Sequence, residues 1–137
     1  MVKTFSAQID DFVSKVEKRM IAVAREATQR TINAAQTPAS KGGRMRVDTG
    51  FLRASGQMSF NGLPTGPRRP DKSGSYDYDS GTMVSTLANL RLGTSVFFGW
   101  TAGYAQIREL KDGFLVSELD NWQSTVDDVV REVKRRI

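Results

Sequence analysis

Apolar residues recur every three or four positions along the N-terminal part of the chain. The repeat starts at Phe5 and continues to Thr31. This spacing is typical of one face of an α-helix, so we predict an amphipathic helix over residues 5–36. Thr4 or Ser6 can cap its first turn. The apolar stripe consists of Phe5, Ile9, Phe12, Val16, Met20, Val23, Ala27 and Thr31.

A second helical repeat lies at the C-terminal end of the chain. Apolar residues from Leu115 to Ile137 again step by three or four positions, which predicts a helix over residues 115–136. Ser117 and Asp120 have the spacing of a capping box at its start.

Shorter patterns lie between the two helices. Residues 51–55 favour a short helical turn, and we expect strands near 57–61 and near 94–100, the latter as a central strand. Residues 83–90 fit either a helical turn or a strand. Residues 104–110 fit either a strand or an extended packed segment.

The remaining segments are rich in glycine, proline and charge. Residues 37–50 are expected to form a basic loop, and residues 62–82 an extended loop without a periodic pattern. An unpatterned stretch of that length in a compact domain usually indicates function or disorder. The order of elements predicts a single α+β domain over residues 1–137. In it, a long N-terminal helix and a C-terminal helix pack on a small antiparallel β-sheet with long polar loops.

Composition narrows the chemistry. The 137 residues include no histidine and no cysteine, which excludes Ser-His-Asp and Cys-His sites, zinc-thiolate centres and disulfides. No phosphate-binding loop motif occurs, and we expect no cofactor and no metal. Adjacent carboxylates such as Asp127 and Asp128 face different directions on a helix, so a solvated helix surface explains them better than catalysis. We therefore do not expect an enzyme.

Positive charge is concentrated in the middle of the chain. Residues 41–72 contain seven basic and two acidic residues, a net +5, which equals the net charge of the whole chain. An arginine-rich loop facing water is typical of a surface that meets a phosphate backbone or an acidic protein face. A plain solvated loop is the alternative. The residues that we expect at such a surface are Arg44, Arg46, Arg68, Arg69 and Lys72.

No apolar run in the sequence approaches the length of a membrane span, and the N-terminus has no signal-peptide core. We therefore expect no membrane partner and synthesis in a cytosol-like compartment.

Two short motifs are more specific. The first is Val47-Asp48-Thr49-Gly50-Phe51-Leu52-Arg53-Ala54-Ser55, and the second is Tyr104-Ala105-Gln106-Ile107-Arg108-Glu109. With the two terminal helices, they resemble the neck (tail-completion, or head–tail joining) proteins of long-tailed bacteriophages, which include the lambdoid minor tail protein Z. Members commonly contain V-D-T-G-x-L-x-x-S and later Y-A-x-x-x-E. The family usually has glycine two residues after that glutamate, where this chain has Lys111, with Gly113 displaced.

The motif residues also have local interpretations. Asp48 or Thr49 can cap the helical turn that follows, and Gly50 permits a close approach of another backbone segment. Trp100 and Tyr104 fit either the core or a contact between subunits. The family-motif residues in this chain are Asp48, Thr49, Gly50, Leu52, Tyr104, Ala105 and Glu109.

The resemblance implies a structural protein of the virion, made in the host cytoplasm and located in the neck at the head–tail junction. Such a protein assembles with itself as a ring of six or twelve subunits. It joins the head-completion or connector protein to the tail terminator or tail tube protein. It leaves an axial channel, where its contacts with genomic DNA are non-specific. The arginine-rich loops would then face that channel or an acidic neighbour. Two alternatives stay open: a tail terminator ring protein, and a free-standing basic nucleic-acid-binding protein.

Overall fold

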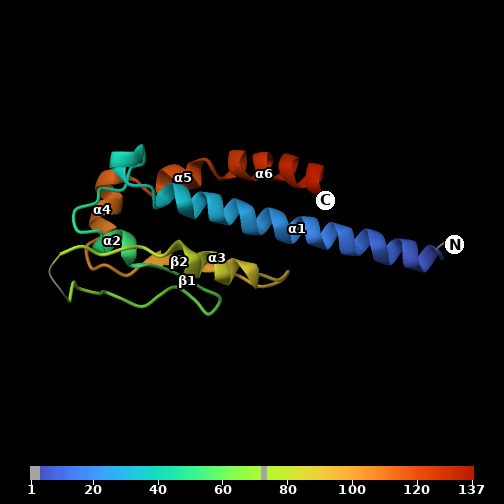
Figure 1. The fold of residues 1–137 in the computed structure, drawn as a ribbon, viewed down its shortest axis with the longest axis horizontal. Coiled ribbons are helices and arrows are strands. Elements are labelled where there is room, and N and C mark those ends of the chain that lie inside the picture. Colours follow the sequence, from blue (N-terminus) through green and yellow to red (C-terminus); the bar gives the residue numbers. More distant parts are fainter. Residues whose placement is uncertain (1–3, 72–73) are drawn as a thin grey trace.

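The computed structural model describes residues 4–71 and 74–137. Helix α1 runs along the length of the molecule, with α5 and α6 on one side and α3 with the sheet on the other (Figure 1). This arrangement confirms the α+β class predicted from the sequence. The elements are α1 (Phe5–Ala35), the 3-10 turn η1 (Ala39–Lys41), α2 (Phe51–Ala54), β1 (Gly56–Ser59), α3 (Ser80–Ala88), β2 (Phe97–Trp100), α4 (Ala105–Asp112), α5 (Val116–Asp120) and α6 (Trp122–Arg136).

Helix α1 confirms the prediction for residues 5–36. The hydroxyl of Thr4 accepts a hydrogen bond from the amide of Ala7 at 3.1 Å, which caps the first turn. The helix has 31 residues and is therefore about 46 Å long. We call residues 5–20 the N-terminal arm. None of its residues, all of them described, is buried. Its first turns extend past the rest of the molecule, and its last residues reach the end of α6, where Arg19 donates to the carbonyl of Ile137 at 3.0 Å (Figure 1).

The C-terminal helix α6 packs along α1. Ala27 of α1 forms a buried cluster with Val129 and Val133 of α6. Ion pairs from Arg30 to Glu132 and from Arg136 to Glu26 join the polar edges of the same contact. We expected this helix to lie on the sheet; instead α1 lies between α6 and the sheet (Figure 1). The reason is that the valine stripe of α6 matches the small-residue surface of α1.

The predicted helix over residues 115–136 is interrupted at Asn121, between α5 and α6. The predicted capping box is also wrong, because Ser117 lies inside α5. A carboxylate from α4 takes that role. Glu109 accepts hydrogen bonds from the amides of Leu115, at 2.9 Å, and of Val116, at 3.4 Å. The start of α5 is therefore stabilised from outside the helix.

Strands β1 and β2 pair antiparallel, with Gln57 opposite Gly99. The strand predicted near 94–100 is shorter than expected and is not central, because within residues 4–71 and 74–137 its sheet has two strands. Pro64 packs against Gly99 on the loop that follows β1. The loop does not add a strand to the sheet, but its Arg68 forms an isolated parallel bridge with Ala102, just past the end of β2.

Helix α3 decides between the two interpretations of residues 83–90 and corrects the predicted loop 62–82. It begins at Ser80, where the carboxylate of Asp79 accepts a hydrogen bond from the amide of Gly81 at 2.8 Å. Its buried face packs with Ile32 of α1. Arg25 of α1 donates to the carbonyl of Leu87 at 2.8 Å, which places a cation at the C-terminal end of α3.

Helix α4 replaces the strand or extended segment that we expected over residues 104–110. Arg108 and Asp112, one helical turn apart, form an ion pair with N–O distances of 2.6–3.0 Å. Gly113 ends the helix with a φ of +63° and donates its amide to the carbonyl of Glu109 at 2.8 Å. The displaced glycine is therefore a C-terminal cap.

Candidate functional site

The two sequence motifs meet at a surface cavity of about 700 Å³. Residues 46–53 form one wall. Pro70, Tyr104 and Arg108 form the other. Parts of the chain that are distant in sequence thus share one concave surface, which we call the motif cavity.

The first motif shapes its wall through local backbone contacts. The Thr49 hydroxyl accepts a hydrogen bond from the amide of Phe51 at 3.3 Å, and the Thr49 carbonyl accepts one from the amide of Tyr76 at 2.7 Å. Gly50 has a φ of +86°, and a Cβ there would lie 2.3 Å from the carbonyl oxygen of Tyr76. The predicted close approach at Gly50 is confirmed. The predicted cap by Asp48 or Thr49 is wrong, because Gly50 is the N-cap of α2 and no side chain caps it; the Thr49 hydroxyl bonds Phe51 from one position before the cap. Asp48 is exposed on the cavity wall.

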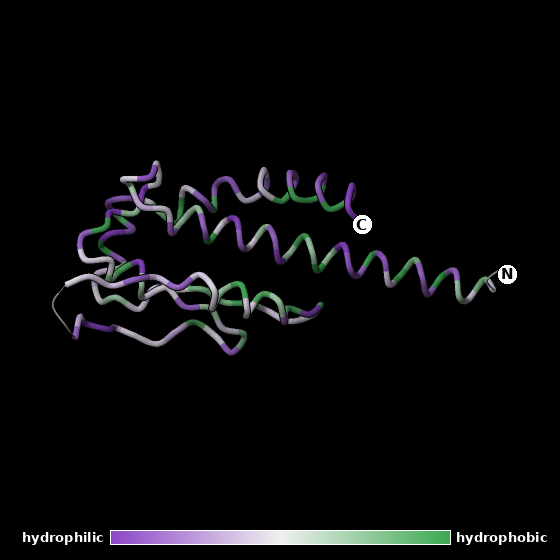
Figure 2. Tube along the Cα trace, in the orientation of Figure 1, coloured by the Kyte–Doolittle hydropathy of each residue, from purple (hydrophilic) through white to green (hydrophobic). Residues whose placement is uncertain are grey.

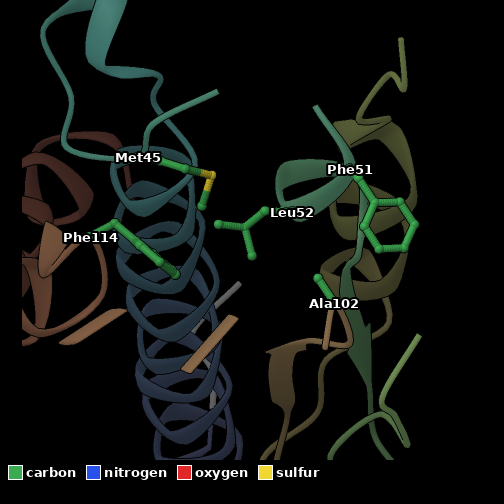
Figure 3. Close-up of a cluster of buried hydrophobic side chains, with 5 residues drawn as sticks. All are labelled: Met45, Phe51, Leu52, Ala102 and Phe114. Atoms are coloured by element: carbon green, nitrogen blue, oxygen red, sulfur yellow. The ribbon is translucent and has the colours of Figure 1, made fainter. Parts of the chain in front are cut away.

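A buried apolar cluster supports the motif cavity from below. Leu52 lies between Met45 and Phe114 on one side and Phe51 and Ala102 on the other (Figure 3). All five side chains are at most 5% exposed. Leu52 therefore contributes through packing, and α2 is fixed to the rest of the domain by this cluster.

The residues of the second motif have two roles: some line the motif cavity and others stabilise the fold. Tyr104 is 38% exposed, lines the cavity, and its ring centroid lies 6.4 Å from that of Phe51. Burial raises the pKa of the Tyr104 phenol, and the negative charge of Asp48 adds to this effect. Ala105 packs against the buried cluster. Glu109 caps α5 and does not line the cavity.

The three arginines of the cavity wall differ in how far they are engaged. Arg108 pairs with Asp112. Arg53 donates to the carbonyl of Gln36 at 2.6 Å, and its guanidinium carbon lies 5.2 Å from the ring centroid of Tyr78. Arg46 is exposed and forms no ion pair with any residue that the structure describes. Arg46 is therefore the wall arginine best placed to bind an external anion.

The other expected arginines lie on exposed loops. The guanidinium of Arg68 stands 5.6 Å from the ring centroid of Phe51, and its backbone amide donates to the carbonyl of Thr101 at 2.6 Å. Arg44 and Arg69 are exposed and do not line the cavity. The remaining expected residue, Lys72, lies outside the described part of the chain.

The side chain of Trp100 makes its contacts within its own chain. Its indole N–H donates to the Gln36 side-chain oxygen at 2.9 Å. Its ring makes edge contacts with Phe98 and Phe114 at centroid distances of 5.1 and 4.9 Å. These contacts favour the core interpretation over the subunit contact.

Sequence reasoning missed Gln36, which is 1% exposed. Its amide nitrogen donates to the carbonyl of Arg53 at 2.9 Å, in addition to its bonds with Trp100 and with the Arg53 side chain. Gln36 thus joins α1, α2 and β2. Sequence reasoning also missed Arg108 and Pro70 as residues of the cavity wall. Arg108 lies within the second motif, and this position could have indicated its role.

Comparison with known proteins adds no relative. No family model, curated protein or solved structure is significantly similar to this chain. Among the described residues, no group of acidic side chains is arranged to hold a metal ion, and no helix is long and apolar enough to cross a membrane. The interpretation of the site therefore rests on its own geometry and on the motifs that meet there.

Proposed function

We propose that this chain is a structural protein of the bacteriophage neck, which assembles into a ring at the head–tail junction around an axial DNA channel. The observation that carries the proposal is the motif cavity. The two stretches on which the resemblance to neck proteins depends are far apart in sequence but adjoin in space, with residues 46–53 facing Tyr104. Motif residues that form one surface can serve one shared contact.

The charge on the cavity side supports a role for DNA in that ring. Arg46 and Arg68 lie on two different loops, are exposed, and form no ion pair with the described residues. A channel through which DNA slides needs contacts to phosphate that are weak and independent of base sequence. Repeated around a ring, such arginines would supply contacts of that type.

The location in the particle is the first test. Mature particles of the phage that encodes this chain would be analysed by mass spectrometry and by imaging of the neck. We expect the chain in the particle as a closed ring between the head connector and the tail. Its absence from mature particles would overturn the proposal. Cross-links to the tail tube without any to a connector protein would favour the tail terminator ring instead.

The arginines provide a second test. The double variant Arg46→Ala with Arg68→Ala removes one charge from the cavity wall and one from the neighbouring loop, where Arg68 stands over the ring of Phe51. We expect it to fold normally and to reduce the yield of particles that retain packaged DNA. The control, Arg91→Ala with Lys111→Ala, removes the same charge from exposed residues that do not line the cavity. Equal yields from the two variants would contradict a channel role, and loss of head–tail joining with intact DNA retention would indicate an acidic protein neighbour.

A free-standing nucleic-acid-binding protein is the second candidate, favoured by the same unpaired arginines. It predicts that the isolated monomer binds duplex DNA with an affinity that falls steeply as salt rises. The neck protein predicts weak binding by the monomer and measurable binding only by the assembled ring. A titration of labelled duplex at two salt concentrations, with monomer and ring fractions separated beforehand, distinguishes the two.

A further inference from the structure

The N-terminal arm presents large apolar side chains to water. Phe5 is 76% exposed and Phe12 is 68% exposed, and Ile9 lies on the same helix face between them. Figure 2 shows the arm projecting beyond the C-terminal end of the chain, with hydrophobic positions recurring along it. Isolated helices of about 12–15 residues are marginal in water, so an arm of this length gains stability when its apolar face is covered.

An apolar groove lies between α1 and α6, with a volume of about 460 Å³. Val23 and Met20 line it from α1, and Val126 and Val130 line it from α6. The groove and the stripe of the arm are continuous, because Met20 belongs to both. The arm is also long enough to fill the groove. The lining from Trp122 to Lys134 runs about 20 Å along α6, and the arm is about 24 Å long.

The charges that flank the two surfaces are complementary. The first turns of the arm carry Asp10 and Asp11 and no basic residue between positions 4 and 14. At the end of the groove, Lys134 lies on the rim and Arg135 follows it on the last turn of α6. Neither forms an ion pair with the described residues. A helix that enters the groove with Asp10 near this end would pair with both cations.

The arm cannot reach the groove of its own chain. Arm and groove both belong to α1, which is one continuous helix from Phe5 to Ala35. Residues 5–12 are therefore held away from residues 20–27 by the helix itself. The occupant that has the right length, apolar pattern and charge, and that is present wherever this chain is present, is the arm of a second copy.

We infer that the α1–α6 groove binds the N-terminal arm of a neighbouring copy, in a head-to-tail contact. Each copy then offers one arm and one groove. Such a contact uses two different surfaces and propagates from subunit to subunit; it forms a ring where the rotation between subunits closes and an open filament where it does not. The presence of this contact in a virion ring rests on the proposed function. The contact between two copies does not, because it can be measured with the isolated chain.

Two single substitutions separate the two surfaces. Phe12→Asp disrupts the arm and leaves the groove, and Val130→Asp disrupts the groove and leaves the arm. By light scattering after size-exclusion chromatography, we expect oligomers of the unsubstituted chain and monomers of each variant. Ser14→Asp and Ser124→Asp, which add the same charge on the opposite helix faces, are expected to leave the oligomers intact.

Mixing the two variants is the decisive measurement. The intact arm of the Val130→Asp chain can enter the intact groove of the Phe12→Asp chain, so we expect a one-to-one heterodimer with twice the mass of a single chain. An arm that paired with another arm would leave Val130→Asp fully oligomeric and would overturn the inference. A monomeric unsubstituted chain at all accessible concentrations would overturn it as well.

Cysteine cross-linking provides a readout that is independent of these charged variants. The chain has no cysteine, so Ile9→Cys and Val130→Cys introduce unique thiols. After oxidation of a mixture, we expect a disulfide-linked heterodimer, and at least tenfold less product when Ser14→Cys replaces Ile9→Cys. Equal yields would contradict the contact. The two proposals can fail separately. If the head-to-tail contact forms but the protein is absent from virions, only the proposed neck function is wrong. If the protein is present in the neck but is a monomer, only the proposed contact is wrong.

Discussion

Helix α1 has one hydrophobic repeat but two environments. In its C-terminal half, Ala27 is buried against α6 and Ile32 against α3, and Thr31 and Ala35 are buried as well. In the N-terminal arm the same repeat is exposed. The side chains differ in size, because small residues let α6 approach α1 closely, whereas the phenylalanines of the arm project outward. The hydrophobic period therefore indicates which face of the helix needs to be covered. It does not indicate which other part of the protein, or which partner, covers that face.

The sharpest test of this comparison truncates one apolar side chain in each half. Ile32 is buried against Met83 and Leu87, so we expect Ile32→Ala to lower the free energy of unfolding by about 3 kcal/mol. Phe12→Ala removes a larger side chain from an exposed site, and at dilutions where the chain is monomeric we expect a change below about 0.5 kcal/mol. Chemical denaturation measures both. Equal losses would mean that the arm is packed against its own chain.

The buried half ends at Gln36, whose polar contacts are internal. Gln36→Leu leaves the indole N–H of Trp100 and the carbonyl of Arg53 without their partner, and we expect a loss of about 2–3 kcal/mol in the free energy of unfolding. The same substitution at exposed Gln57 is the control, with an expected change below about 0.5 kcal/mol. Thermal unfolding compares the two. A neutral Gln36→Leu would show that this junction does not hold the buried half in place.

Beyond Gln36, the wall of the motif cavity depends on a glycine. Gly50→Ala adds a Cβ at a positive φ and against the carbonyl of Tyr76, so we expect a loss of about 2 kcal/mol. Gly42 also has a positive φ, +91°, but no atom lies within 4 Å of an added Cβ. Gly42→Ala is therefore expected to cost about 1 kcal/mol, from the backbone conformation alone. If denaturant titrations gave the same loss of unfolding free energy for Gly50→Ala and Gly42→Ala, the contact with the carbonyl of Tyr76 would not contribute.

The smallest effect is expected at the polar edge of the buried half. Arg30 and Glu132 are each 44% exposed, so their ion pair is largely solvated. A double-mutant cycle with alanine at both positions should give a coupling energy of about 0.5 kcal/mol, which decreases as salt rises. A larger coupling that is insensitive to salt would show that charge, and not the apolar contact, holds α6 on α1.

The fold was predictable where a pattern is long and local. The repeat of α1 extends over eight positions, seven of them apolar, and glycine is the residue that admits a close backbone approach such as that of Tyr76 at Gly50. Both features were therefore correctly predicted. Helix α4 was not, because its eight residues contain too few apolar positions to set a period. The break at Asn121 was also missed, since the apolar repeat continues past it. The cap at the start of α5 was missed because its carboxylate, Glu109, comes from another helix.

The candidate site was predictable only in part for the same reason. Asp48 and Tyr104 were expected to matter as motif residues, but their meeting at one cavity depends on how α2 and α4 pack on a shared apolar cluster. Arg46 was expected on a charged surface, whereas the internal use of Arg53 and Arg108 was not. Pairing between side chains from distant segments has no periodic signature.

The loop after β1 has a consequence for crowded conditions. A free edge of a β-sheet is a template on which other chains can add strands and begin to aggregate. Pro64 packs on the face of β2 at Gly99. Farther along the same loop, the amide of Arg68 donates to the carbonyl of Thr101 at 2.6 Å, and the amide of Gly103 donates to the carbonyl of Arg68 at 2.9 Å. Where many copies of this chain accumulate in a small volume, the backbone groups of Thr101 and Gly103 that this loop occupies are closed to strands from other copies.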